Sequence, residues 1–230
     1  MRGIWQRLLN VLAAVTTWRF FKPAVFVACL IPPVLVAWRL YAFFSGANPD
    51  ALGVDPNKTV LHQTGQNTLA LLFITLGVTP ARRLLKLNGL QKVRRMLGVW
   101  TFTYAVFHLS SYLVFEQLCY SWATCQLGDI GADLVKRKFI IAGMTAFTIL
   151  TLLAITSTSG WVRRLRKNWQ RLHRLVYVAA VAGIVHFLWI QKSDFREPLQ
   201  WALWLAVLFA LRVGFTIQKR RAHLQKPVTA

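Results

Sequence analysis

The chain has 230 residues, of which 56% are hydrophobic, and its 28 lysines and arginines stand against seven acidic residues, for a net charge of +21. Its mean hydropathy of +0.44 excludes a disordered basic tail, and a soluble domain with this charge would be less apolar. The combination is typical of a polytopic membrane protein. Three cysteines exclude a disulfide-rich scaffold, and the sequence contains no Cys-x-x-Cys-His, dinucleotide-binding or P-loop motif.

Six apolar stretches are long enough to cross, or nearly cross, a hydrocarbon core of about 30 Å. The first contains Pro32-Pro33, which should kink it, and Arg39 near its far end. The third contains no Asp, Glu, Lys or Arg. We therefore predict an all-α integral membrane fold, with a six-helix transmembrane bundle over residues 23–216. Its spans are residues 23–44, 64–80, 96–115, 139–156, 173–191 and 198–216.

Loop charge predicts the orientation of these spans. Basic residues concentrate before the first span, after the second, after the fourth and in the tail, residues 217–230, whereas all seven acids fall on the opposite side. Both termini are therefore predicted to be cytoplasmic. Residues 1–22 are predicted to form a cytoplasmic or interfacial segment, since Trp18 to Lys22 follow its apolar run where a signal peptide would have small residues. Charge divided among short loops beside the membrane argues against a nucleic-acid partner and for contact with lipid.

Three histidines, His108, His173 and His186, lie within or at the edge of apolar spans. Ionisable residues there usually face the bundle interior and mark a site, and imidazole is the usual axial ligand of a haem held between helices. His108 lies about 18 Å, and His186 about 21 Å, from the inner ends of their spans, so the two are level and predict a shared haem. His173 lies about 19.5 Å below His186 and, in an ideal helix, on a different face. Hydrogen bonding across helices is the alternative role for all three.

Other polar residues have less specific predictions. His62 is expected at the outer mouth of the second span and His223 in the solvated tail. Arg39 either pairs with a haem propionate or extends its guanidinium to the membrane surface. Cys119 and Cys125 lie in a predicted outer loop, and the sequence is compatible with either a disulfide between them or two free thiols.

An ordered set of short stretches resembles one known family. Together with the six spans, they resemble the ferric-reductase-like transmembrane domain shared with NADPH oxidases, and within it the MsrQ (YedZ) family. The sequence departs from the family pattern at Lys136-Arg-Lys138-Phe139, where the family has a proline. The matching stretches are His62-Gln-Thr-Gly65, Val78-Thr-Pro80, Arg94-Arg-Met-Leu-Gly-Val-Trp100 leading to Phe107-His-Leu109 and Tyr112, Thr156-Ser-Thr158, and Trp169-Gln-Arg-Leu-His-Arg-Leu-Val-Tyr177 leading to His186-Phe-Leu-Trp189.

This resemblance implies a b-type cytochrome of the bacterial inner membrane that passes electrons from the quinone pool to a periplasmic molybdenum-containing methionine sulfoxide reductase. The pair would repair oxidised periplasmic proteins, and this chain would be the electron-transfer subunit, with no catalytic residues of its own. The resemblance implies one or two haems b, with His108, His186 and His173 as iron ligands, and FMN as a further cofactor. Only His108 matches the two third-span histidines of the double-haem oxidases.

Two other functions fit the same sequence. About fourteen residues follow the sixth span, so we expect electrons to arrive from a lipid-soluble donor or a separate soluble reductase, with His173 marking their arrival point or a second haem. A stand-alone ferric or metal reductase of this fold would instead deliver electrons to iron chelates. A cofactor-free anchoring protein would use its histidines only for packing.

Overall fold

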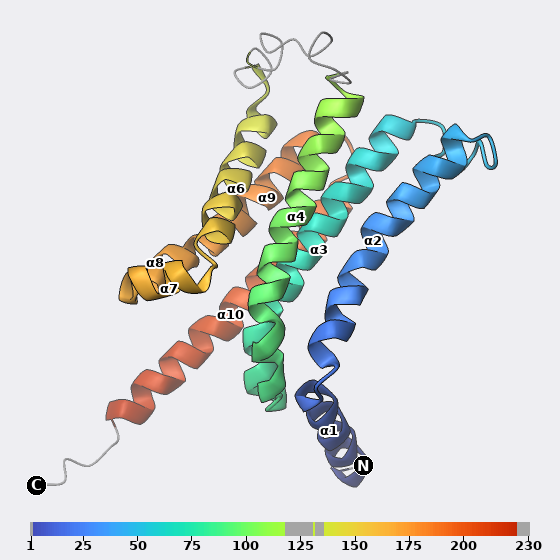
Figure 1. Ribbon diagram of the computed structural model, residues 1–230. Helices are drawn as coiled ribbons and strands as arrows, with labels where there is room; N and C mark the ends of the chain where they lie inside the picture. The colour runs from blue at the N-terminus through green and yellow to red at the C-terminus, as the bar shows by residue number, and fades with distance from the viewer. Residues whose placement is uncertain (1, 118–130, 132–135, 225–230) are drawn as a thin grey trace, which may run out of the picture.

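The computed structural model describes residues 2–117, 131 and 136–224, and in these the chain forms helices and no strand (Figure 1). Six long helices coincide largely with the six predicted spans. They are α2 (Phe21–Phe44), α3 (Pro56–Leu85), α4 (Gln91–Phe115), α6 (Lys138–Ile155), α9 (Val176–Ile190) and α10 (Arg196–Leu224). The shorter helices are α1 (Arg2–Thr17), η1 (Asn88–Leu90), α7 (Ser159–Leu165), α8 (Lys167–Leu172) and η2 (His173–Leu175).

Five of the described helical segments are long and apolar enough to cross a membrane, namely α2, α3, α6, α10 and the run Lys167–Ile190 that ends in α9. The predicted class, an all-α multi-pass membrane protein, is confirmed to that extent. The third predicted span corresponds to α4, which is 25 residues long but does not belong to this set. Hydroxyl side chains lower its hydropathy, and some of them are sheltered by neighbouring helices: Thr101 is 1% exposed, whereas Ser110 is exposed. A count of six spans stays a prediction.

The helices pack as two close pairs, α3 with α4 and α6 with α9, and α4 and α6 join the pairs. The main apolar core lies where α3 meets α9, with Leu72 and Leu76 of α3 against Ala179 and Ala180 of α9. Both alanines are fully buried. Small side chains let membrane helices approach closely, because van der Waals packing is the main force between them. The two pairs therefore form a continuous bundle, with α2 and α10 packed outside it.

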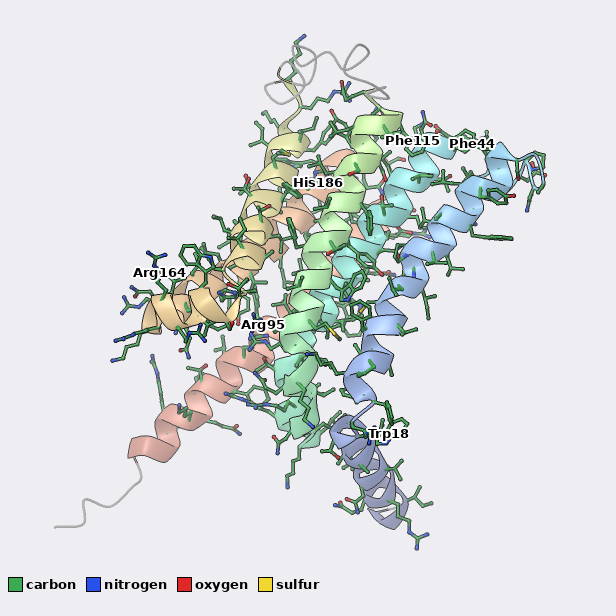
Figure 2. The ribbon with its side chains drawn as sticks, in the orientation of Figure 1. Trp18, Phe44, Arg95, Phe115, Arg164 and His186 are labelled. Carbon is green, nitrogen blue, oxygen red and sulfur yellow. The ribbon has the colours of Figure 1, made fainter. Side chains whose placement is uncertain are left out.

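The two ends of the bundle differ in character (Figure 2). Trp18, Arg95 and Arg164 lie at one end, here named the basic end, and Phe44 and Phe115 lie at the other, here named the far end. Helices α1, α7 and α8 all lie toward the basic end (Figure 1). The predicted outer loop with Cys119 and Cys125 lies outside the described residues, as does any disulfide between them.

The proline pair of α2 is accommodated by a contact from α4. Pro33 has no N–H, so the carbonyl of Cys29, four residues earlier, loses its usual helical partner. The hydroxyl of Tyr104 on α4 donates to that carbonyl over 2.8 Å. Neighbouring side chains commonly satisfy backbone groups freed by proline in membrane helices. This bond fixes α2 against α4 in the middle of its length.

Candidate functional site

His108 of α4 and His186 of α9 lie side by side within the bundle. Their ring centroids are 6.1 Å apart and their planes are inclined by 80°. Both side chains are partly buried, and His186 lies in the half of the bundle toward the far end (Figure 2). The level positions expected from helix rise therefore correspond to a direct approach of the two rings in space.

A threonine on α3 holds the His108 ring. Thr64 Oγ lies 3.1 Å from Nδ1 of His108 and donates its own proton to the carbonyl of Val60 over 2.8 Å. With its single proton on the Val60 carbonyl, Thr64 accepts the Nδ1–H of His108. The ring also interacts with the backbone of Leu61. This arrangement places the proton on Nδ1 and leaves the Nε2 lone pair for a metal ion.

A backbone carbonyl holds the His186 ring in the same protonation state. Nδ1 of His186 lies 2.7 Å from the carbonyl oxygen of Phe139, at the start of α6. A carbonyl only accepts hydrogen bonds, so Nδ1 carries the proton and Nε2 is the free nitrogen. Metal-binding histidines almost always donate their other ring N–H to a carbonyl or carboxylate in this way.

Each of the two rings packs against a glycine of a neighbouring helix. A Cβ added at Gly65 of α3 would lie 3.2 Å from Cε1 of His108, and one added at Gly143 of α6 would lie 2.7 Å from Nδ1 of His186. The carbonyl four residues before a helical position accepts from its N–H, so Gly143 leaves the Phe139 carbonyl uncovered for His186. Gly65 stands in the same relation to Leu61. Both glycines therefore make room for an imidazole.

The geometry of this pair fits a single haem iron. Two imidazoles on opposite faces of one metal ion, each at a bond length of about 2 Å, have ring centroids roughly 6 Å apart, which matches the separation of His108 and His186. His108 and His186 would supply the two ligands that a porphyrin does not give its iron. The chemistry and the tautomers of the donor set therefore suit a bis-histidine haem between the α3–α4 and α6–α9 pairs.

The structure places His173 apart from the other two membrane histidines. It begins η2, near the basic end, and its ring stacks on Trp169 at 3.9 Å. Its Nδ1 lies 3.1 Å from the Trp169 carbonyl, and its Nε2 lies 3.4 Å from the hydroxyl of Ser157. Because η2 separates His173 from α9, the angle expected from one ideal helix does not apply. Its role as an iron ligand stays a prediction.

Arg39 and His62 lie near the far end, on α2 and α3. Arg39 donates to the side-chain carbonyl of Gln63 over 3.0 Å. His62 lies 3.3 Å from Glu197 at the start of α10, which also accepts from Gln66 over 2.8 Å. The pairing of Arg39 with a haem propionate stays a prediction.

Sequence reasoning found the two histidines but missed the residues that position them: Thr64, Gly65, the Phe139 carbonyl and Gly143. The stretch His62-Gln-Thr-Gly65 carried the resemblance without any physical role attached to it. A usable signal was present, since a glycine inside an apolar span indicates a close approach by another group.

Known proteins match most of the chain. Residues 64–184 match the family described as ferric reductase like transmembrane component. A Xanthomonas campestris pv. campestris (strain B100) protein named protein-methionine-sulfoxide reductase heme-binding subunit MsrQ is 43% identical over 200 residues, which are 87% of this chain and 88% of the relative. A Herminiimonas arsenicoxydans protein of the same name is 42% identical over 202 residues, 86% and 87% of the two chains. No solved structure matches. The chain thus belongs to the MsrQ family, within the ferric-reductase-like transmembrane proteins.

Proposed function

We propose that this chain is a haem-binding electron-transfer subunit of a methionine sulfoxide reductase system, with one haem b held between His108 and His186. The observation that carries the proposal is the 6.1 Å separation of the two rings, from different helices, with both Nδ1 atoms already engaged. The relatives named as haem-binding subunits support it.

The membrane arrangement follows from charge. We place the basic end in the cytoplasm, with six spans including α4, because basic residues mark inner loops. α4 carries polar side chains that would be costly against lipid, and its neighbours bury some of them, Thr101 among them. The proposed haem then lies toward the outer face of a bacterial inner membrane, on the side of a periplasmic acceptor.

Bound haem supplies the one-electron chemistry, and the chain supplies ligands, orientation and burial. Thr64 and the Phe139 carbonyl hold the imidazoles in the tautomer that presents Nε2. The apolar core between α3 and α9 excludes water beside the site, with Leu69 and Ile184 buried there. The protein thus insulates a redox centre within the bilayer.

The donor, the acceptor and the remaining site residues complete the proposal. Quinol of the respiratory pool is the donor, and a periplasmic molybdenum-containing methionine sulfoxide reductase is the acceptor. His173, near the basic end, marks a second haem or a second point of electron arrival, and Arg39 binds a haem propionate. FMN is carried over from the resemblance only. These roles rest on the residue matches to the family.

Purified protein from haem-replete cells tests the function as a whole. We expect a reduced b-type spectrum, reduction of the haem by quinol, and its reoxidation only when the periplasmic reductase and a methionine sulfoxide are added. A colourless preparation would point to the anchoring function. Reduction of ferric chelates by quinol without the periplasmic subunit would point to the stand-alone metal reductase.

Thr64→Val should weaken the site without removing a ligand. Loss of an outer hydrogen-bond partner typically lowers metal affinity about 10–100-fold. Without the acceptor on Nδ1, His108 becomes a less basic ligand, so the ferric state loses stabilisation and the reduction potential rises. Haem titration and a redox titration measure the two effects.

The matched control is Thr68→Val, one turn along α3, whose hydroxyl donates only to the Thr64 carbonyl, over 2.8 Å. Its haem affinity and potential should equal those of the unmodified protein. Equal behaviour of both variants would show that Thr64 does not position His108.

A further inference from the structure

Two hollows lie beside α2 in the half of the bundle toward the far end, one between α2 and α3 and one between α2 and the α3–α4 pair. The deeper one, about 160 Å³, has mainly apolar walls that include Val36, Leu40 and Phe107. The second, about 540 Å³, is lined by polar side chains that include Arg39 and Gln63. Consecutive residues line both, since Leu40 follows Arg39 and Thr64 follows Gln63. The two hollows share no lining residue but follow one another along α2 and α3, and they are together named the α2 groove, with an apolar part and a polar mouth.

One polar side chain in the apolar part lacks a partner. Asn67 lines the deeper hollow, and no residue that the structure describes forms a hydrogen bond with its carboxamide. An amide left unpaired at membrane depth is costly, because lipid offers no hydrogen bonds. A ligand with a polar atom at this depth would satisfy Asn67, whereas a lipid acyl chain would not.

A second amide stands one helical turn away. Gln63 and Asn67 are four residues apart on α3, so they share one face with their Cβ atoms about 5–6 Å apart. Arg39 occupies the Gln63 carbonyl oxygen, over 3.0 Å, which leaves the amide protons of Gln63 as donors. Two amides at this spacing, with apolar walls between them, match a flat ring that carries an oxygen at each end.

The groove lies beside the proposed haem ligand and beside lipid. Thr64 lines the deeper hollow and also binds the His108 ring, and Phe107 directly precedes His108. On the outer side, Val34 and Leu35 of α2 are exposed on the apolar surface. A ring in the groove would thus be one side chain away from His108, with a path for an isoprenoid tail into the membrane.

We propose that the α2 groove binds a quinol, with its two ring oxygens on Gln63 and Asn67 and its ring against Val36 and Phe107. This rests on the proposed function, in which quinol is the electron donor. Oxidation of the quinol to a quinone releases two electrons and two protons. A haem held by His108 would accept the electrons one at a time, and the protons would pass to water at the polar mouth.

A pair of tryptophan substitutions on α2 tests this site. Ala37 lines the deeper hollow, so Ala37→Trp should fill it, whereas Ala28→Trp places the same indole on an exposed position of α2 outside the groove. The probes are a short-tailed benzoquinone and a short-tailed naphthoquinone, and binding to the haem-loaded protein in detergent is measured by equilibrium dialysis. We expect Ala37→Trp to abolish binding and Ala28→Trp to leave the Kd unchanged.

Asn67→Leu provides a second variant that keeps the shape of the groove. Loss of one hydrogen bond should raise the Kd roughly five- to tenfold. The haem spectrum, unchanged in each variant, reports that the His108–His186 pair is intact. The site is wrong if the unmodified protein binds neither quinone, or if Ala37→Trp and Asn67→Leu both bind as tightly as the unmodified protein.

The rate of haem reduction by quinol separates this inference from the proposed donor. Fast reduction that survives both groove substitutions would keep quinol as the donor and overturn the site. Binding that both substitutions weaken, with no reduction of a haem that dithionite does reduce, would support the site and overturn the donor.

Discussion

Replacing His186 with alanine is expected to remove the b-type absorption bands of the purified protein. Substitution of outer partners alone costs a haem or metal site about 10–100-fold in affinity, so loss of the ligand itself should exceed that range. His108→Ala should have the same effect, because the two rings approach within 6.1 Å and would share one iron. Haem per polypeptide, measured by pyridine haemochrome, gives the result directly.

Two further histidine variants sharpen the comparison. His223→Ala, in the basic tail, is the control and should keep the full haem content. His173→Ala reports the number of centres: a single haem at the His108–His186 pair predicts unchanged content, and a second haem predicts loss of about half. Unchanged bands in both His108→Ala and His186→Ala would contradict the ligand assignment.

The level positions of His108 and His186 could be predicted because they follow from local geometry. A rise of about 1.5 Å per residue places both at similar depths once the spans and their directions are known. The long helices were predictable for a similar reason, since long apolar stretches need backbone bonds within themselves in lipid. The structure gives each a helix, although α3 and α10 extend beyond their predicted apolar cores.

The positioning of the imidazoles could not be predicted, because it depends on which helices touch. Thr64 reaches His108 across 44 residues of sequence, and the Phe139 carbonyl reaches His186 across 47. Phe139 lies in the stretch that departs from the family pattern. It contributes only its backbone carbonyl, so the identity of its side chain does not indicate the contact.

The angular relation of His173 to His186 shows the limit of ideal geometry. Thirteen residues of one regular helix would put the two on different faces. The structure instead tightens the helical run into a 3-10 turn at η2, which begins at His173, and Trp169 stacks on the ring. Such a turn depends on tertiary contacts, among them the bond from the Trp169 indole to the Thr156 carbonyl, over 2.9 Å.

Gly143→Ala is expected to disrupt the haem site almost as strongly as loss of His186, although it adds one methyl group. The new Cβ would lie 2.7 Å from Nδ1 and 2.9 Å from Cε1 of His186, closer than real contacts allow. The ring is also bound to the Phe139 carbonyl over 2.7 Å, so it cannot move aside without losing that bond. Haem content and the low-spin spectrum should both fall.

Controls distinguish displacement of the ring from damage to the helix. Alanine is a better helix former than glycine by about 1 kcal/mol, so α6 itself should not weaken and helical circular dichroism should be retained. Gly77→Ala in α3 meets no atom within 4 Å and should keep its haem, while Gly65→Ala, at 3.2 Å from Cε1 of His108, should show an intermediate loss. A Gly143→Ala protein with full haem and an unchanged spectrum would mean that His186 is not held against α6. That result would contradict the assignment of His186 as a ligand oriented by the Phe139 carbonyl.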